Sequence, residues 1–168
     1  MGRKMDKIQK LTINCIVLIS FSSAIFTDEL KDIIDSKKSS FEEIALDIWN
    51  YAELGYLETK SSNLLASELE ENGFIIQKGV AGIPTSFIAE FNNGGPVIGI
   101  LGEFDALPGL AQTNSPFKEV ADNETGAGHA CGHHLFGAAS AWAAVVIKEW
   151  IEENNIEGAL NTWKKLLA

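Results

Sequence analysis

The sequence predicts an α/β fold in which helices flank a central sheet. Helical patterns precede three short β-rich runs and a longer apolar helix follows them, an order typical of helices packed on a sheet. The third run, Val-Ile-Gly-Ile-Leu over 97–101, shows no alternation of apolar and polar residues, so we expect a central strand buried on both faces. The length of 168 residues suits one core, and 46% apolar with 21% charged residues is the composition of a folded chain.

The first 26 residues differ in charge from the rest of the chain. Four basic side chains and one acidic side chain lie in the first ten residues, and an uncharged apolar run over 11–26 follows, with small residues at 22–24. This layout is typical of a secretory signal peptide, and the run is shorter than the ~20 residues of a spanning helix. We expect residues 1–26 to direct export to the periplasm or the medium. The alternatives are an uncleaved membrane anchor and a plain extension of a cytoplasmic protein.

Three helical segments are expected before the sheet. The first ends within the Ser-Lys-Lys-Ser-Ser stretch at 36–40. The second starts at Ser40, which with Glu43 forms a capping box, and its apolar residues recur at period 3.6 as far as Gly55. The third covers 59–72, where a glycine follows directly and stops the helix.

The strands are expected at 74–78, 85–91 and 97–101. The sequence Asn-Asn-Gly-Gly-Pro between the second and third strands predicts a tight connection. Residues 102–128 show no periodicity and form a long loop of the kind that usually carries function. A helix over 134–153 follows, apolar on most sides and therefore packed against the sheet.

The residues with metal-binding chemistry lie at the two ends of this loop. A thiolate and neutral imidazoles bind borderline divalent metals such as zinc, and carboxylates extend this preference to Mn²⁺ or Fe²⁺. Two carboxylates leave the third strand, and three imidazoles and a thiol stand just before the last helix: Glu103, Asp105, His129, Cys131, His133 and His134. An i, i+2 pair such as Cys131 and His133 cannot share a helix face, but both side chains can point one way in an extended or looped backbone. A helix N-terminus next to them would favour the thiolate.

Structural interpretations compete with this chemistry. The histidine-rich segment could be an adventitious metal-binding loop, Cys131 a buried core thiol, Asp105 a cap and Glu103 a solvated charge.

The sequence gives no support to several other classes of function. A net charge of −10 without a basic stripe excludes nucleic acid as the expected partner. The chain also lacks a Gly-x-Ser-x-Gly elbow, a phosphate-binding loop, a His-Glu-x-x-His motif and a dinucleotide fingerprint.

The segments 96–110 and 128–137 resemble the dinuclear-metal amidohydrolase and metallopeptidase family, which includes aminobenzoyl-glutamate, hippurate and auxin-conjugate hydrolases. Upstream stretches at 48–55, 58–61 and 79–85 are similar to the aminobenzoyl-glutamate branch, in the same order along the chain. The resemblance implies a metallohydrolase catalytic domain, of which this chain carries the N-terminal portion. It also implies hydrolysis of the amide bond in an N-acyl or N-aryl amino acid, with two zinc or manganese ions per site, and in the intact family a homodimer is possible.

The resemblance also implies roles for individual residues. By position, Cys131 and His133 correspond to metal ligands, and Asp105 to the catalytic acidic residue that orients a ligand. The supporting positions behind these ligands are His129, His134 and Glu103.

The last ten residues do not resemble the family. We therefore expect residues 27–158 to be the N-terminal part of the catalytic domain, and residues 159–168 to be an atypical tail produced by a frameshift or an early stop. Because the family's glutamate base and further ligands follow this point, such a truncated chain would be inactive, and its third strand would leave an open apolar edge. The alternatives are a non-catalytic metal-binding fragment and half of a split enzyme completed by a second chain.

Overall fold

The computed structural model describes residues 30–156 and, as backbone only, residues 159–163. The chain divides into two units, Met1–Ser36 and Lys37–Ala168. In the first unit residues 30–36 are described; they are helical, and Lys31 pairs with Asp35. The expected signal peptide lies outside the described residues. Within the described part of the chain, no helix is long and apolar enough to cross a membrane.

Residues 30–51 are all helical, so the expected break at 36–40 and the capping box at Ser40 were wrong. The Ser-Lys-Lys-Ser-Ser stretch contains no glycine or proline, and serine and lysine are tolerated inside a helix. The helix also ends earlier than Gly55. Ala52 takes a positive φ of 41°, which ends the helical run just after residue 51.

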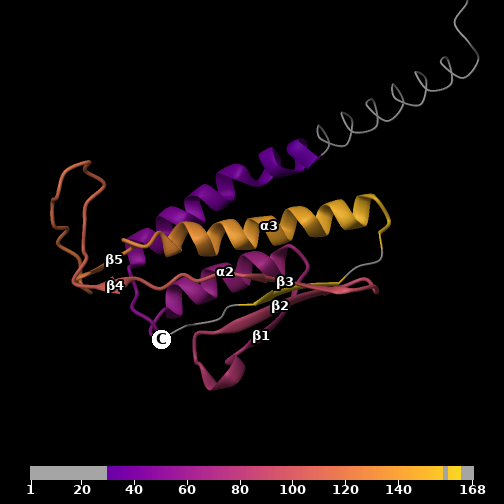
Figure 1. Ribbon diagram of the computed structural model, residues 1–168, viewed down its shortest axis with the longest axis horizontal. Helices are drawn as coiled ribbons and strands as arrows, with labels where there is room; N and C mark the ends of the chain where they lie inside the picture. The colour runs from indigo at the N-terminus through magenta and orange to yellow at the C-terminus, as the bar shows by residue number, and fades with distance from the viewer. Residues whose placement is uncertain (1–29, 157–158, 164–168) are drawn as a thin grey trace, which may run out of the picture. The chain divides into compact units, whose positions relative to one another are not determined.

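Four strands form the main sheet, in the order β1-β2-β6-β3 (Figure 1). They span Ile75–Lys78 (β1), Phe87–Asn92 (β2), Val97–Leu101 (β3) and Ala159–Trp163 (β6). β1 and β6 each pair antiparallel with β2, and β3 pairs parallel with β6. The first three strands match the expected ones. A strand at β6 was not expected, and it lies between β2 and β3.

β3 is not the buried central strand that its apolar sequence predicted. It is an edge strand among the described residues, paired with β6 on one side. Val97 and Ile98 are 66% and 55% exposed, and Leu101 is 39% exposed. Only Ile100 of this strand packs against the main core. The prediction failed because an unbroken apolar run fits a strand that is covered on both faces, and the described residues leave Val97 and Ile98 uncovered.

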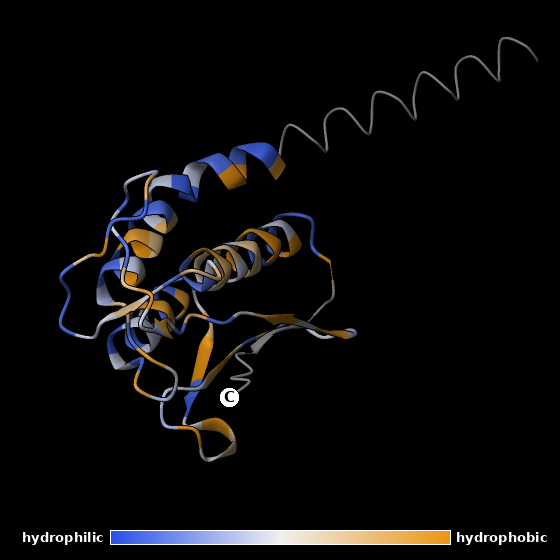
Figure 2. Cartoon of the chain, turned by 60° about the vertical axis from the view of Figure 1, so that its left-hand side comes forward, coloured by the Kyte–Doolittle hydropathy of each residue, from blue (hydrophilic) through white to orange (hydrophobic). Residues whose placement is uncertain are grey.

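Two helices, α2 (Thr59–Glu71) and α3 (His133–Glu153), pack on the sheet close to their expected bounds (Figure 1). The core combines side chains from these helices, from the preceding helix and from the strands, and Figure 2 shows hydrophobic residues on helices and strands alike. Its most deeply buried members include Phe41, Ile48, Leu65, Leu69, Phe104 and Val145.

The long loop after β3 is closed at its base. β4 (Leu107–Pro108) and β5 (Ala127–Gly128) form a two-stranded antiparallel ladder. A Cβ on Gly128 would lie 2.0 Å from the carbonyl oxygen of Leu110, so only glycine fits there. The two ends of the loop that carry the candidate site residues are thus held together.

Elsewhere in the fold, a short 3-10 turn, η1 (Val80–Gly82), connects β1 to β2.

Candidate metal centre

The candidate centre is formed by the segment that leaves β3 and by the first residue of α3. Glu103 and Asp105 lie on the segment, and His133 opens the helix after Gly132, which takes a left-handed φ of 76°. Beyond Asp105, the backbone N–H of Ala106 donates to the carbonyl of Glu53 at 2.7 Å. The segment is therefore fixed on both sides of the two carboxylates.

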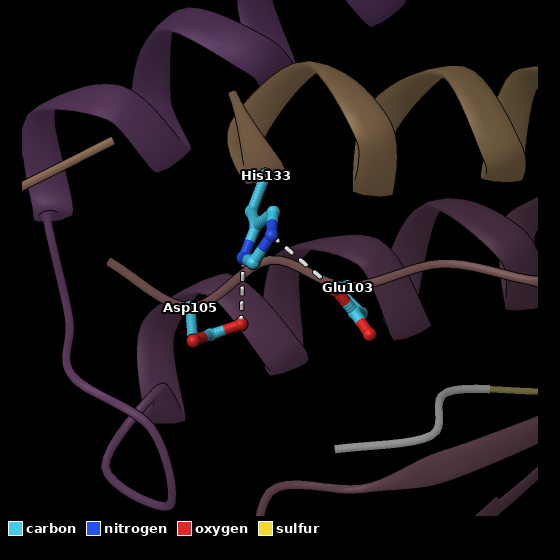
Figure 3. Close-up of side chains that lie close together, drawn as sticks. All are labelled: Glu103, Asp105 and His133. Carbon is cyan, nitrogen blue, oxygen red and sulfur yellow. Dashed lines mark hydrogen bonds and ion pairs between the residues drawn. The ribbon is translucent and has the colours of Figure 1, made fainter. Parts of the chain in front are cut away.

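The imidazole of His133 lies between the two carboxylates (Figure 3). Its Nδ1 is 3.0 Å from Oδ1 of Asp105, and its Nε2 is 3.3 Å from Oε2 of Glu103. One potential ligand atom from each of the three residues lies within 4.8 Å of the other two. The side chains are only 17–21% exposed, so the cluster is partly shielded from solvent.

This geometry leaves one acceptor facing another. A neutral imidazole has one N–H and one lone pair. If Nδ1–H donates to Asp105, the lone pair of Nε2 points toward the carboxylate of Glu103, and two acceptors at this distance need a proton or a cation between them. Oxygen and imidazole donors together suit divalent ions such as zinc and manganese. The donor set of the cluster therefore fits such an ion.

The other two histidines lie beside Trp49, and His129 is also close enough to Asp105 and His133 for both to act on its pKa. The His129 ring is 5.0 Å from that of His134, which in turn meets Trp49 edge-on at 4.9 Å. Nε2 of His129 is 3.0 Å from the carbonyl oxygen of Ile48, and Nδ1 of each histidine has no hydrogen-bond partner among the described residues.

Burial disfavours the charged form of both rings. It lowers the pKa of His129 below its ordinary value. Burial, helped by the neighbouring His129, lowers the pKa of His134 to about 4. Nothing in the sequence indicated that Trp49 would meet these histidines.

Cys131 lies on the turn before α3, and it is exposed. Within the described part of the chain, the close group of ligand atoms consists of Glu103, Asp105 and His133, without this thiol. The role of Cys131 as a ligand stays a prediction. Glu103, expected only in a supporting position, instead faces Nε2 of His133 directly.

The fold is that of a mixed α/β domain, and the cluster of Glu103, Asp105 and His133 has donor atoms of the kind found in metal sites. A protein of Bacillus subtilis described as a dinuclear metal binding peptidase of the M20 family superposes with a TM-score of 0.63 at 28% identity, over 76% of this chain and 34% of that one. A Staphylococcus aureus protein at 21% identity has a TM-score of 0.65, which supports the fold alone. No family model matches the sequence.

Two curated relatives are similar to this chain in sequence. One of the subunits of the p-aminobenzoyl-glutamate hydrolase of Escherichia coli is 40% identical over 124 residues, which are 74% of this chain and 26% of that protein. The hippurate hydrolase of Campylobacter jejuni is 29% identical over 80% of this chain and 33% of its own length. The chain is thus a homologue of these two hydrolases and of the Bacillus subtilis M20 peptidase, and it spans about a quarter to a third of their lengths.

Proposed function

We propose that this chain supplies part of the metal centre of an amidohydrolase that cleaves the amide bond of an N-acyl or N-aryl amino acid. The observation that carries the proposal is the imidazole of His133 held between Asp105 and Glu103. Support comes from relatives named for p-aminobenzoyl-glutamate, hippurate and N-acetylcysteine, three amino acids substituted on nitrogen. Substrates of the p-aminobenzoyl-glutamate or hippurate type are therefore the first to test.

Each residue of the cluster has a separate task in this proposal. Asp105 accepts the Nδ1–H of His133 and so leaves the lone pair of Nε2 facing the carboxylate of Glu103. Nε2 and the carboxylate of Glu103 would hold a divalent ion, and Cys131 would join them if the turn before α3 brings its thiolate inward. When bound, the ion would polarise the amide carbonyl and lower the pKa of a bound water. Zinc would be favoured with the thiolate present, and manganese with oxygen ligands alone.

Export is a further part of the proposal and rests on residues 1–26. Expression in a bacterial host, followed by N-terminal sequencing of the protein recovered from the periplasm or the medium, tests it. A mature N-terminus close to residue 26 supports a signal peptide. An intact Met1 on cytoplasmic protein contradicts export, and an intact Met1 on membrane-bound protein supports an anchor.

The test of function combines ion binding with turnover. The purified chain is titrated with Zn²⁺ and with Mn²⁺, and hydrolysis of hippurate and of p-aminobenzoyl-glutamate is followed with each ion. His133→Ala and Cys131→Ala are the matched variants. Ion binding and turnover that are both lost in His133→Ala support the proposal. The same two measurements on Cys131→Ala decide whether the thiol is a ligand.

Two outcomes separate the alternatives. The exposed edge of β3 favours a sheet that continues beyond this chain. Ion binding without turnover, restored by adding the portion of the Escherichia coli relative that this chain does not match, would support a split enzyme. Ion binding that no added chain converts into turnover would support a non-catalytic metal-binding protein. No ion binding at all would contradict the proposed centre.

A further inference from the structure

The segment that carries the site carboxylates runs unusually close to α3, and glycines make the approach possible. A Cβ on Gly137 would lie 2.9 Å from Cβ of Phe104 and 3.0 Å from the carbonyl oxygen of Glu103. Contacts this short require something to shift, and both neighbouring atoms belong to the backbone or to a buried residue. Gly137 has no left-handed φ to explain it, because it lies inside the helix, where glycine is unfavourable. Close packing is therefore the physical reason for a glycine at this position.

A second glycine faces the first from the other side. A Cβ on Gly102 would lie 3.0 Å from Cβ of Ser140 and 3.5 Å from Cα of Gly137. The Ser140 hydroxyl donates to the carbonyl oxygen of Leu101 at 2.9 Å, which ties the helix to the last residue of β3. We call Gly102, Gly137 and Ser140 together the glycine clamp.

The clamp residues lie close in sequence to the candidate ion site, both on the segment after β3 and on α3. Gly102 precedes Glu103 directly, and His133 lies four residues before Gly137, on the same face of the helix. The separation between His133 and the carboxylates therefore follows from how closely the clamp brings α3 to this segment. Metal sites tolerate ligand distances only within about ±0.2 Å. A methyl group at the clamp would demand a displacement of at least that size.

We propose that Gly102, Gly137 and Ser140 are positioning residues that set the distance between His133 and the carboxylates of Glu103 and Asp105. The ion-binding part of this inference rests on the proposed function. The part that concerns the contact between His133 and Asp105 does not, because that contact exists without an ion.

The test compares Gly137→Ala and Ser140→Ala with Ala144→Gly. Ala144 is fully buried two turns further along the same helix, so its replacement by glycine weakens α3 without touching the clamp. Ser140→Ala adds no atoms and keeps a good helix former, so it remains informative if Gly137→Ala does not fold. Each variant is measured for its melting temperature and its affinity for Zn²⁺ alone. The tautomer of His133 is read without metal, at neutral pH, from the ¹⁵N chemical shifts of its ring.

If the clamp positions His133, the clamp variants should lose ion affinity, whereas the control variant should lose stability alone. We expect Gly137→Ala to weaken Zn²⁺ binding about 10–100-fold, the range seen when groups that orient ligands are lost. Ser140→Ala should weaken it less. Both should reduce the Nδ1–H form of His133, whereas Ala144→Gly lowers the melting temperature but leaves affinity and tautomer unchanged. Equal changes in all three variants, or an unaltered tautomer in Gly137→Ala, would overturn the inference. If the wild-type chain binds no Zn²⁺, the proposed function fails, and the tautomer measurement alone decides on the clamp.

Discussion

A single side chain, His133, connects the two elements of the candidate centre. Its position between two carboxylates was partly predictable, because Asp105 was expected to orient a ligand and these two residues lie in contact. The contact of Glu103 with Nε2 was not predictable, since side-chain direction in an irregular segment depends on the packing of that segment against α3. The same limit applies to His129 and His134, whose neighbouring positions in sequence gave no indication that they would meet Trp49.

The carboxylate of Asp105 should control the ion affinity of His133. Asp105→Asn keeps the shape of the side chain but allows the amide to donate to Nδ1, which favours the wrong imidazole tautomer. We expect Zn²⁺ affinity to fall about 10–100-fold while the melting temperature changes little. Isothermal titration with Asp105→Asn and with Asp122→Asn, a control at an exposed aspartate outside the cluster, checks this. An affinity equal to wild type would show that Asp105 does not orient the ligand.

The neutral ring of His134 should make stability depend on pH. Its pKa is lowered to about 4 in the folded protein, against 6.5 in the unfolded chain. Between these values the unfolded chain binds a proton that the folded protein does not, so stability is greatest above pH 6.5 and falls as the pH drops toward 4. Because the ring is only partly buried, we expect a loss of about 1–2 kcal/mol.

Urea unfolding in the presence of a chelator, at pH 7 and pH 5, measures this effect. His134→Phe keeps the ring contact with Trp49 but cannot titrate, so its stability should change less over the same interval. Part of the pH dependence should persist in this variant, because the pKa of His129 is also lowered. An identical pH dependence in wild type and His134→Phe would contradict the assignment to His134.

Among the elements, those defined by local pattern were predicted well and those defined by neighbours were not. α2, α3 and β3 follow their periodicity, glycine stops and proline boundaries to within about two residues. The helix over 30–51 was divided wrongly because serine favours a cap and tolerates a helix interior as well. β6 was missed because its five residues carry no strand pattern of their own, and pairing on both sides defines the strand.

The start of α2 depends on a side chain from outside the helix. Glu58 at the N-cap makes no side-chain capping bond, and the carboxylate of Glu53 instead accepts the backbone N–H groups of Lys60 and Ser61 at 3.0 and 2.8 Å. We expect Glu53→Ala to lower the free energy of unfolding by about 1 kcal/mol, as for the loss of an N-cap. Glu53→Gln should retain part of this stability. Urea unfolding of the two variants checks both values, and no loss in Glu53→Ala would rule out capping by Glu53.

At the scale of the whole molecule, the edge at β3 should promote self-association. β3 exposes apolar side chains and contains no charged residue that would oppose pairing with another strand. Among the described residues it has a strand neighbour on one side only. Val97→Lys should reduce concentration-dependent association in sedimentation velocity experiments. Leu57→Lys, at a position that is 65% exposed and lies outside the sheet, is the matched control. Equal association of the two variants would show that the β3 edge is not responsible.

The ladder between β4 and β5 has a consequence for how such a protein can change. It closes the base of the loop between them, while Glu53 holds the segment beyond Asp105 and Gly128 packs on Leu110. Residues inserted or deleted near the exposed Phe117 and Val120 would lengthen or shorten the loop without moving its base. The loop is therefore the part of the chain in which new contacts can accumulate through insertion and deletion, while the contacts of His133 with Asp105 and Glu103 stay in place.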